Sequence, residues 1–262
     1  MKVVILCGGM GTRIRDVSSD IPKPMIPIGS TPILWHIMQS YSSAGYKEFV
    51  LCLGYQSHVI KEFFLNYTTN TRDVTLRLGR NSAVEISDAS PCEAEGWRIA
   101  LSETGLHTMT GGRIRRIKSY VADDDCFMLT YGDGVSDVDI GALVQFHRSH
   151  GKLLTVTGVR PPGRFGELTV VNGDEVVAFN EKPQVSDGLI SGGYFVCSSD
   201  IFRYLEGGGD SLVFENEPLS RMAADGEVRV FVHGGFWHPM DTYRDYVYLN
   251  GLWEKGEAPW KP

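Results

Sequence analysis

A glycine-rich turn placed directly after a short apolar run is the feature that most constrains how this chain of 262 residues can fold. From Leu6 to Met25 the sequence reads LCGGMGTRIRDVSSDIPKPM. Gly8, Gly9 and Gly11 leave no side chain between the backbone amides and an incoming anion, and glycine permits the positive φ that lets successive N–H groups converge. The pattern predicts a strand that ends near Leu6 and opens into a phosphate-binding loop.

Cationic side chains strengthen this interpretation. Thr12 and Arg13 complete the turn, and the planar guanidinium of Arg13 offers a fork of donors to phosphate oxygens. Lys23 stands between two prolines, so a stiff extended tether delivers its compact charge to a fixed point. Glycine turns alone more often end a strand than bind phosphate, but the added threonine, arginine and Pro-Lys-Pro favour a grip for a triphosphate.

Two better-known glycine motifs do not fit this turn. A dinucleotide fingerprint needs a third glycine where Ile14 stands, and a P-loop needs Gly-Lys-Ser/Thr where Gly11 is followed by Thr12 and Arg13. The sequence therefore predicts a nucleotide site of a different kind.

Composition excludes several classes of function. The formal net charge is −7 and no run of lysine and arginine occurs, so we expect no nucleic-acid partner. No apolar run approaches the length of a membrane span and the first residues do not form a secretory signal, so we expect no membrane partner and a cytoplasmic location. The five cysteines show no zinc-ligand spacing, and an odd number of them suits a reducing compartment.

Hydrophobic patterning predicts an α/β fold: a doubly wound, mostly parallel, Rossmann-like sheet with helices on both faces and a smaller mixed or antiparallel layer. Strand-like runs at Val3–Cys7, Phe49–Leu53, Cys126–Thr130 and Leu153–Val159 alternate with helical patterns at Ile33–Ala44, Val59–Asn66, Gly112–Val121 and Ile140–His150. A helix at Phe214–Asp225, a strand at Val228–Val232 and a closing helix at Thr242–Lys255 follow.

Two stretches break this rhythm. Residues 68–104 carry short alternating pieces (VTLRL, AVEIS, WRIAL), which we interpret as an antiparallel excursion or a subunit-contact element. After Pro161, GELTVV, GDEVVAF and ISGGYFVC indicate strands of the smaller layer. We expect one domain over residues 1–262, with a nucleotide-binding core over about residues 1–160 and a sugar-phosphate-binding part over about residues 161–262.

Candidate metal ligands lie at the carboxyl ends of the predicted strands, where open parallel sheets bind ligands. Gly132 and Gly134 flank Asp133 after an apolar strand, which lets the carboxylate reach a ligand without crowding. Asp241 stands at the mouth of the closing helix. Two carboxylates together with phosphate oxygens suit Mg²⁺. A turn-forming role for Asp133 and a helix-capping role for Asp241 stay open.

Further candidates for ligand binding carry weaker signals. Glu181 and Lys182, stiffened by a following proline, suit a sugar hydroxyl and a second phosphate, although an exposed charged pair at a strand end is by itself slightly the more common explanation. Gly193, next to Tyr194, indicates either close approach to a ligand or a strand bulge. A second set, placed where a helix begins, offers amide donors and a guanidinium to a phosphate or a base: Thr110, Gly111 and Arg113.

Together these motifs resemble the sugar-phosphate nucleotidyltransferase family over nearly the whole chain. LCGGMGTR followed by PKP matches the family's glycine-rich pattern, and MTGGR, TYGDGVSDVDI, NEKP, SGGYFV and GFWHPMDT resemble the branch that transfers a cytidylyl group to glucose 1-phosphate. Cys7 departs from the family's more usual alanine. The resemblance implies CTP and glucose 1-phosphate as substrates, CDP-glucose and pyrophosphate as products, a role in dideoxy-sugar synthesis for surface polysaccharide, and a homo-oligomer of hexameric type.

The resemblance also implies roles for individual positions. The residues expected to contact the nucleotide are Leu6, Gly8, Gly9, Gly11, Thr12, Arg13, Lys23, Thr110, Gly111, Arg113 and Gly132. The residues expected to contact the sugar phosphate are Glu181, Lys182, Gly193 and Tyr194. Asp133 and Asp241 are the expected Mg²⁺ ligands. Arg13, Lys23 and Lys182 are the expected catalytic cations.

Three alternatives remain beside this assignment. A relative with a different sugar 1-phosphate or nucleotide carries the same motifs. A metal-dependent glycosyltransferase accounts for Asp137-Val138-Asp139 but has no need of the triphosphate grip. A non-catalytic nucleotide-sugar-binding subunit would retain the fold without turnover.

Overall fold

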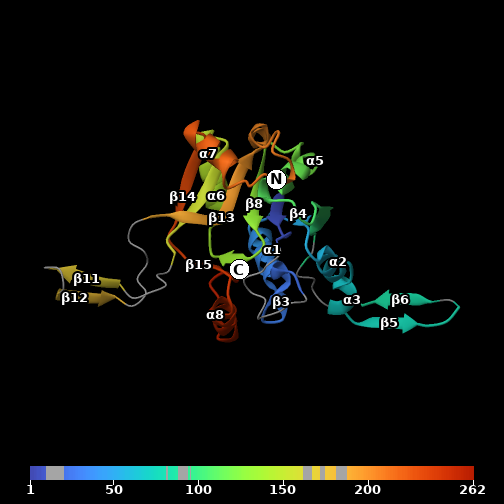
Figure 1. Cartoon of the computed structure of the whole chain (residues 1–262). Coiled ribbons are helices and arrows are strands. Elements are labelled where there is room, and N and C mark those ends of the chain that lie inside the picture. The colour runs from blue at the N-terminus through green and yellow to red at the C-terminus, as the bar shows by residue number, and fades with distance from the viewer. Residues whose placement is uncertain are drawn as a thin grey trace.

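A twisted central sheet organises the molecule. The computed structural model describes residues 1–9, 21–80, 82–87, 94, 96–161 and 188–262, together with the backbone of two strands at 167–171 and 175–180. Within these residues, seven strands form one sheet in the order β14-β10-β13-β8-β1-β4-β7 (Figure 1). The strands are β1 (Val3–Leu6), β4 (Glu48–Leu53), β7 (Arg98–Glu103), β8 (Cys126–Tyr131), β10 (Leu154–Val159), β13 (Ile190–Ser198) and β14 (Val228–His233).

The sheet is mostly parallel, as the sequence predicts. β1 pairs in parallel with β4 and β8, β4 pairs in parallel with β7, and β10 pairs in parallel with β14. Only β13 runs against both of its neighbours, β8 and β10. All four residues of β1 are buried, because a strand covered on both faces is apolar throughout.

Helices cover both faces of this sheet. The described helices are α1 (Ile33–Ser43), α2 (Ser57–Leu65), α3 (Tyr67–Thr71), α4 (Thr110–Arg116), α5 (Lys118–Val121), α6 (Ile140–His150), α7 (Glu217–Ala224) and α8 (Tyr243–Glu254), of which α3 has no buried residue. Val3 and Ile5 of β1 belong to a core with α1, α6 and α8, whereas Val4 and Leu6 belong to a second core with α4, α5 and α7. Successive side chains of a strand point to opposite faces, so one strand feeds both cores. The doubly wound fold is confirmed.

Three expectations about elements need correction. ISGGYFVC, expected in the smaller layer, instead forms β13 within the central sheet. WRIAL, expected in an antiparallel excursion, instead forms edge strand β7, parallel to β4. The helix expected at Gly112–Val121 begins earlier, at Thr110, and is divided at Ile117, whose ψ of 8° interrupts the helical backbone between α4 and α5.

Strands from beyond residue 160 join the same sheet as the strands of the first half. β13 lies between β8 and β10, and its residues from Gly192 to Cys197 are therefore buried. GELTVV and GDEVVAF form a separate antiparallel pair, β11 (Glu167–Val171) and β12 (Glu175–Asn180). The division into nucleotide and sugar-phosphate parts stays a prediction about which substrate each part binds.

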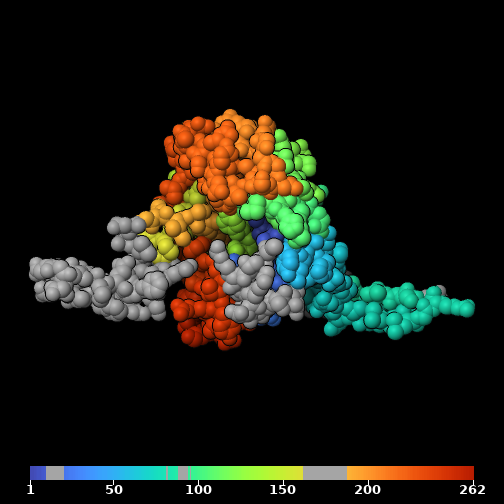
Figure 2. All heavy atoms as spheres, viewed as in Figure 1, coloured from blue at the N-terminus to red at the C-terminus, as the bar shows by residue number. Residues whose placement is uncertain are grey.

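A second antiparallel pair projects as an arm from the body of the molecule. β5 (Val74–Arg77) and β6 (Ala83–Ile86) pair with Leu76 opposite Val84 and Val74 opposite Ile86. Figures 1 and 2 show this arm extending away from the sheet and its helices. None of the described helices is long and apolar enough to cross a membrane.

Short elements shape the carboxyl edge of the sheet. The 3-10 turn η2 (Lys23–Met25) and the small pairs β2 (Pro27–Ile28) with β3 (Thr31–Pro32) and β9 (Gly134–Ser136) with β15 (Trp237–Pro239) lie there. Two further 3-10 turns, η3 (Ser199–Tyr204) and η4 (Gly209–Ser211), precede α7.

Candidate active site

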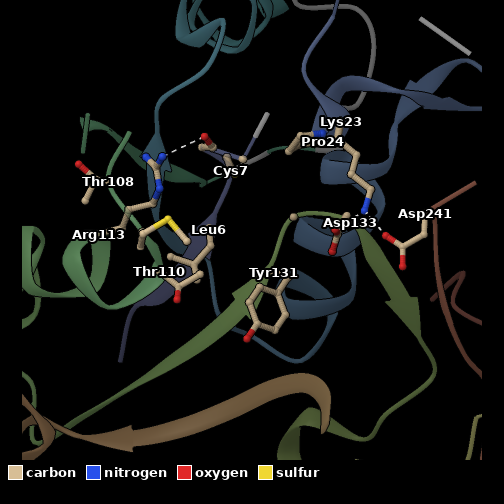
Figure 3. A pocket seen from close by; sticks show the side chains of 14 residues that line it. Leu6, Cys7, Lys23, Pro24, Thr108, Thr110, Arg113, Tyr131, Asp133 and Asp241 are labelled. Atoms are coloured by element: carbon tan, nitrogen blue, oxygen red, sulfur yellow. Dashed lines mark hydrogen bonds and ion pairs between the residues drawn. The ribbon is translucent and has the colours of Figure 1, made fainter. Parts of the chain in front are cut away.

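Three charged side chains from distant parts of the chain meet at one point. Lys23 Nζ lies 2.5 Å from Asp133 Oδ2 and 2.5 Å from Asp241 Oδ1, and it donates a hydrogen bond to each carboxylate (Figure 3). The side chain of Lys23 is 13% exposed, whereas those of Asp133 and Asp241 are 33% and 30% exposed. The two acids that the sequence singles out as metal ligands therefore converge, and the lysine of Pro-Lys-Pro joins them.

Local structure explains why these side chains reach the same place. Pro22 is extended and Lys23 opens η2 directly after it, so the proline ring fixes the approach of the lysine. Asp133 follows β8, and β9 then pairs with β15 so that Gly134 lies opposite Pro239. The N–H of Met240 donates to the carbonyl of Asp133 over 2.8 Å. This pairing holds Asp241 beside Asp133.

The electrostatics of the cluster favour its charged form. Burial lowers the pKa of Lys23, but the charges and hydrogen bonds of Asp133 and Asp241 outweigh burial and raise the pKa above its usual value. Asp133 Oδ2 and Asp241 Oδ1 each lie 2.5 Å from Lys23 Nζ. The two carboxylate oxygens are therefore no farther apart than twice that distance. Hard anionic oxygens this close are the protein ligands that Mg²⁺ prefers alongside phosphate and water, so the donor set fits the predicted metal ion.

A cavity of about 400 Å³ opens beside this cluster, at the carboxyl ends of β1 and β8 and the start of α4. Ligand cavities of small molecules commonly begin at about 300 Å³. Seven residues predicted to contact the nucleotide line it: Leu6, Gly8, Gly9, Lys23, Thr110, Arg113 and Gly132. Asp133 and Asp241 close one end of it. The described start of the predicted triphosphate loop, Gly8 and Gly9, therefore shares one cavity with the predicted metal ligands.

A smaller cavity of about 200 Å³ adjoins the first. Tyr131, Asp133 and Asp241 line both cavities, and the second is completed by β13 and β15. Gly193 and Tyr194, predicted to contact the sugar phosphate, line this second cavity. Two compartments thus meet at the carboxylate pair.

Gly193 and Tyr194 have clear structural reasons for their identity. Gly193 has a φ of +78°, and a Cβ atom there would lie 2.5 Å from the Tyr131 ring. The buried hydroxyl of Tyr194 donates to the carbonyl of Gly134 over 3.1 Å, and burial raises the pKa of Tyr194 above its usual range. Gly193 therefore allows Tyr131 to stand at the boundary of the two cavities, and the Tyr194 hydroxyl braces the turn after Asp133.

Arg113 is a buried clamp on the backbone. Only 4% of its surface is exposed, and its guanidinium donates to Leu53 O at 2.8 Å, to Thr104 Oγ1 at 2.7 Å and to Gly8 O at 2.9 Å. Burial is the largest influence on the Arg113 pKa and lowers it. These acceptors stand at the ends of three parallel strands, so Arg113 ties the start of the glycine-rich loop to the sheet. Its predicted contact with the nucleotide stays a prediction.

We predict that Gly8→Ala destabilises the protein by about 1–3 kcal/mol, the usual cost of overpacking a core. A Cβ atom at Gly8 would lie 2.1 Å from Nη1 of Arg113, whereas a Cβ atom at Gly9 meets nothing within 4 Å. Gly9→Ala is therefore the matched control, with an expected change of about 0.5 kcal/mol or less. Urea unfolding measures both variants, and equal stability for the two would show that Arg113 does not hold Gly8.

Gly111 and Gly112 allow another segment to pack closely on α4. A Cβ atom at Gly111 would lie 2.8 Å from the side chain of Leu212, and one at Gly112 would lie 3.0 Å from Gly209 O. The N–H of Gly112 already donates to Leu212 O over 3.1 Å. Gly111 does not line the cavity. The glycines of MTGGR thus have a packing role that the sequence does not reveal, because their partner lies about a hundred residues later.

Five predicted site residues lie outside the described residues: Gly11, Thr12, Arg13, Glu181 and Lys182. Their assignments to the triphosphate and the sugar phosphate stay predictions.

Sequence reasoning did not identify two residues of this region, Tyr131 and Glu215. Tyr131 lines both cavities, and its hydroxyl donates to Glu215 Oε1. Thr110 Oγ1 donates to the other oxygen, Glu215 Oε2, over 2.5 Å. The position of Tyr131 directly before Gly-Asp-Gly was an available signal, but Glu215 lies in a polar connection with no pattern of its own.

Comparison with known proteins identifies relatives along nearly the whole chain. A family model described as nucleotidyl transferase matches residues 2–251. A glucose-1-phosphate cytidylyltransferase of Salmonella typhi is 48% identical over 261 residues, which cover 100% of this chain and 99% of that protein. A probable glucose-1-phosphate cytidylyltransferase of Bacillus subtilis (strain 168) is 44% identical, with the same coverage of both chains.

A solved structure shares the fold. The crystal structure of HddC from Yersinia pseudotuberculosis superposes with a TM-score of 0.66, covering 96% of this chain and 99% of that chain at 23% sequence identity. The family match over residues 2–251 and the full-length identity to curated relatives show that this chain belongs to the nucleotidyl transferase family.

Proposed function

We propose that this chain transfers a cytidylyl group from CTP to α-D-glucose 1-phosphate and releases pyrophosphate and CDP-glucose. The observation that carries the chemistry is the meeting of Lys23, Asp133 and Asp241 where two adjoining cavities touch. The identity of base and sugar rests on the 48% full-length identity to the Salmonella typhi enzyme of that name. The larger cavity suits the nucleotide and the smaller one the sugar phosphate.

The reaction requires positioning and charge compensation more than proton transfer. An oxygen of the sugar phosphate attacks the α-phosphorus of CTP, a new P–O bond forms, and the bond to the β-phosphate breaks as pyrophosphate leaves. The attacking oxygen is already anionic at neutral pH, so no general base is needed. Lys23 supplies fixed positive charge where the two polyanions approach, which lowers their repulsion in a partly buried site. Arg13 and Lys182 are proposed to add to this charge.

We propose Mg²⁺ as the cofactor, held by Asp133 and Asp241. Both carboxylates point at the same position, and this is the observation that supports the proposal. A bound Mg²⁺ supplies Lewis-acid stabilisation of phosphate charge. Asp133 and Asp241 would orient this ion, because the pairing of β9 with β15 fixes the two acids relative to each other.

The decisive experiment measures pyrophosphate release from four nucleoside triphosphates, each combined with a panel of sugar 1-phosphates and Mg²⁺. We expect turnover with CTP and glucose 1-phosphate to exceed every other pair. Turnover with a different pair would move the assignment to another member of the family. Binding of CTP without pyrophosphate release would favour a non-catalytic nucleotide-sugar-binding subunit, and release of a nucleoside diphosphate from CDP-glucose would favour a glycosyltransferase.

We also propose that the protein works as a homo-oligomer, with the β5–β6 arm as a contact between copies. One face of the arm is apolar: Leu76 is 61% exposed, Leu78 86% and Val84 59%. Leu76 lies opposite Val84 in the pairing, so these side chains share that face. An exposed apolar face on a two-stranded arm is a surface that a second copy can bury.

Leu76→Glu is therefore expected to dissociate the oligomer, because a carboxylate would be buried without a partner in the contact. Sedimentation velocity measures the mass of the assembly. Thr75→Lys, which places a charge on the opposite face of the same strand across from Glu85, is the control and should leave the mass unchanged. An unchanged mass for Leu76→Glu would place the contact elsewhere.

The location and the pathway complete the proposal. The described cysteines Cys7, Cys52, Cys126 and Cys197 are free thiols, which suits the reducing cytoplasm. We propose that CDP-glucose formed there supplies dideoxy-sugar synthesis for surface polysaccharide such as O-antigen.

A further inference from the structure

Glu215 lies behind the boundary between the two cavities and contacts both sides of it. One carboxylate oxygen accepts from the Tyr131 hydroxyl, and the other accepts from Thr110 Oγ1 over 2.5 Å. Tyr131 lines both cavities, whereas Thr110 lines only the larger one. Glu215 itself lines neither cavity, whereas both hydroxyls that it holds belong to residues that do.

The two hydroxyls are held in a defined direction. Thr110 Oγ1 accepts a hydrogen bond from the N–H of Phe214 over 2.9 Å, so its own proton is directed to Glu215. The Tyr131 hydroxyl donates to the other oxygen of the same carboxylate, so both hydroxyls point at Glu215. Figure 3 shows both hydroxyls on the same side of the cavity, away from Lys23.

The segment that carries Glu215 is fixed to α4 by the backbone. The N–H of Met109 donates to Asp210 O over 2.8 Å, and that of Gly112 donates to Leu212 O over 3.1 Å. Arg116 adds two hydrogen bonds to the Asp210 carboxylate at 2.9 and 2.8 Å. Because α4 begins at the larger cavity, Glu215 is attached to the nucleotide side of the site. Its bond to Tyr131 is the connection to the other side.

Tyr131 has little freedom where it stands. The absence of a Cβ atom at Gly193 leaves room for its ring, and the ring packs edge-on to Phe195 with centroids 6.0 Å apart. Asp133 follows two residues later along the same backbone. A shift of the Tyr131 ring therefore changes the wall shared by both cavities, next to Asp133, which also lines both.

We propose that Glu215 is a positioning residue that fixes the boundary between the two cavities, holding Thr110 and Tyr131 so that the nucleotide and the sugar phosphate are aligned for in-line transfer. This inference rests on the proposed function only in requiring two substrates to meet beside Tyr131. Misplacement of reacting groups by about 1 Å can cost on the order of a hundredfold in rate.

The test compares steady-state kinetics of Glu215→Ala, Glu215→Gln, Tyr131→Phe and the double variant Glu215→Ala/Tyr131→Phe. We expect Glu215→Ala to lower kcat at least about tenfold, with a smaller change in KM for CTP, because alignment is lost more than binding. Glu215→Gln keeps an oxygen acceptor for one hydroxyl and should recover most of the loss. The double variant should lose no more than about twofold beyond Glu215→Ala, because both changes break the same bond.

Controls separate positioning from stability and from the choice of substrate. Glu217→Ala removes an exposed carboxylate, two residues after Glu215, that pairs with Arg221 at 2.9 Å. This change should leave kcat within about twofold of the parent. Thermal unfolding of every variant shows whether the protein is folded at the assay temperature. The parent is first assayed on the substrate panel, and the kinetics then use whichever pair it turns over, so a wrong substrate assignment does not imitate a failed test of Glu215.

Two results would overturn the inference. One is a kcat for folded Glu215→Ala within about twofold of the parent. The other is a double variant whose loss equals the product of the two single losses, because Glu215 and Tyr131 would then act independently.

Discussion

Replacing Asp133 with asparagine is expected to lower kcat by about a hundredfold or more while the fold is retained. Asparagine has the same shape but removes one of the two negative charges that converge on Lys23 and replaces a hard anionic ligand by a neutral amide. Pyrophosphate release at saturating CTP, glucose 1-phosphate and Mg²⁺ measures the loss. The Mn²⁺ affinity of the variant, measured by electron paramagnetic resonance, should fall in parallel.

Asp137→Asn is the matched control for this change. Asp137 lies four residues later, beyond β9, and contacts His233 Nε2 at 2.9 Å instead of Lys23. It lines neither of the two cavities, so kcat should stay within about threefold of the parent. Near-normal turnover of purified, folded Asp133→Asn would remove Asp133 from the proposed metal site.

Replacing Lys23 with methionine is expected to lower kcat/KM for CTP by about a hundredfold or more. Methionine keeps an unbranched side chain of similar length but no charge, so the cavity loses the cation that faces the arriving triphosphate. Asp133 and Asp241 would then face each other without their shared donor, and their repulsion adds to that of the substrate. Steady-state kinetics with varied CTP measure the effect.

Lys152→Met is the corresponding control. Lys152 lies 3.8 Å from Glu227, and its side chain is 32% exposed. It lines neither active-site cavity, so we expect kcat/KM to change by no more than about threefold. If Lys23→Met retained parental kcat/KM, the positive charge needed for transfer would have to come from residues other than Lys23.

The charged centre of this site could be predicted because its residues stand beside strong local signals. Asp133 lies between glycines after an apolar strand, and Lys23 lies between prolines. Such neighbours fix the backbone in the same way wherever the segment folds, so local reasoning identifies the side chains that they expose. The parallel strands were equally accessible, because burial on both faces leaves a continuous apolar run.

The rest depends on partners that are remote in sequence. The acceptors of Arg113 are backbone carbonyls and a threonine hydroxyl on other strands, and no side-chain pattern encodes them. WRIAL forms the edge strand β7, in which Arg98 is exposed and Ile99, Ala100 and Leu101 are only half-buried. It therefore lacks the long apolar run of a fully covered strand, and nothing local indicates its parallel pairing. Glu215 joins two hydroxyls that lie 105 and 84 residues away. These features follow from tertiary packing alone.

The cluster of Lys23, Asp133 and Asp241 also has a consequence for how the protein acquires activity as it folds. Lys23 is 110 residues from Asp133 and 218 residues from Asp241 along the chain. Loops of this length close at an entropic cost that is recovered only when the intervening strands have paired. A partly folded chain with helices formed but β15 not yet docked on β9 therefore keeps Asp241 away from Lys23. The cluster of Lys23, Asp133 and Asp241 therefore forms only once the topology is complete.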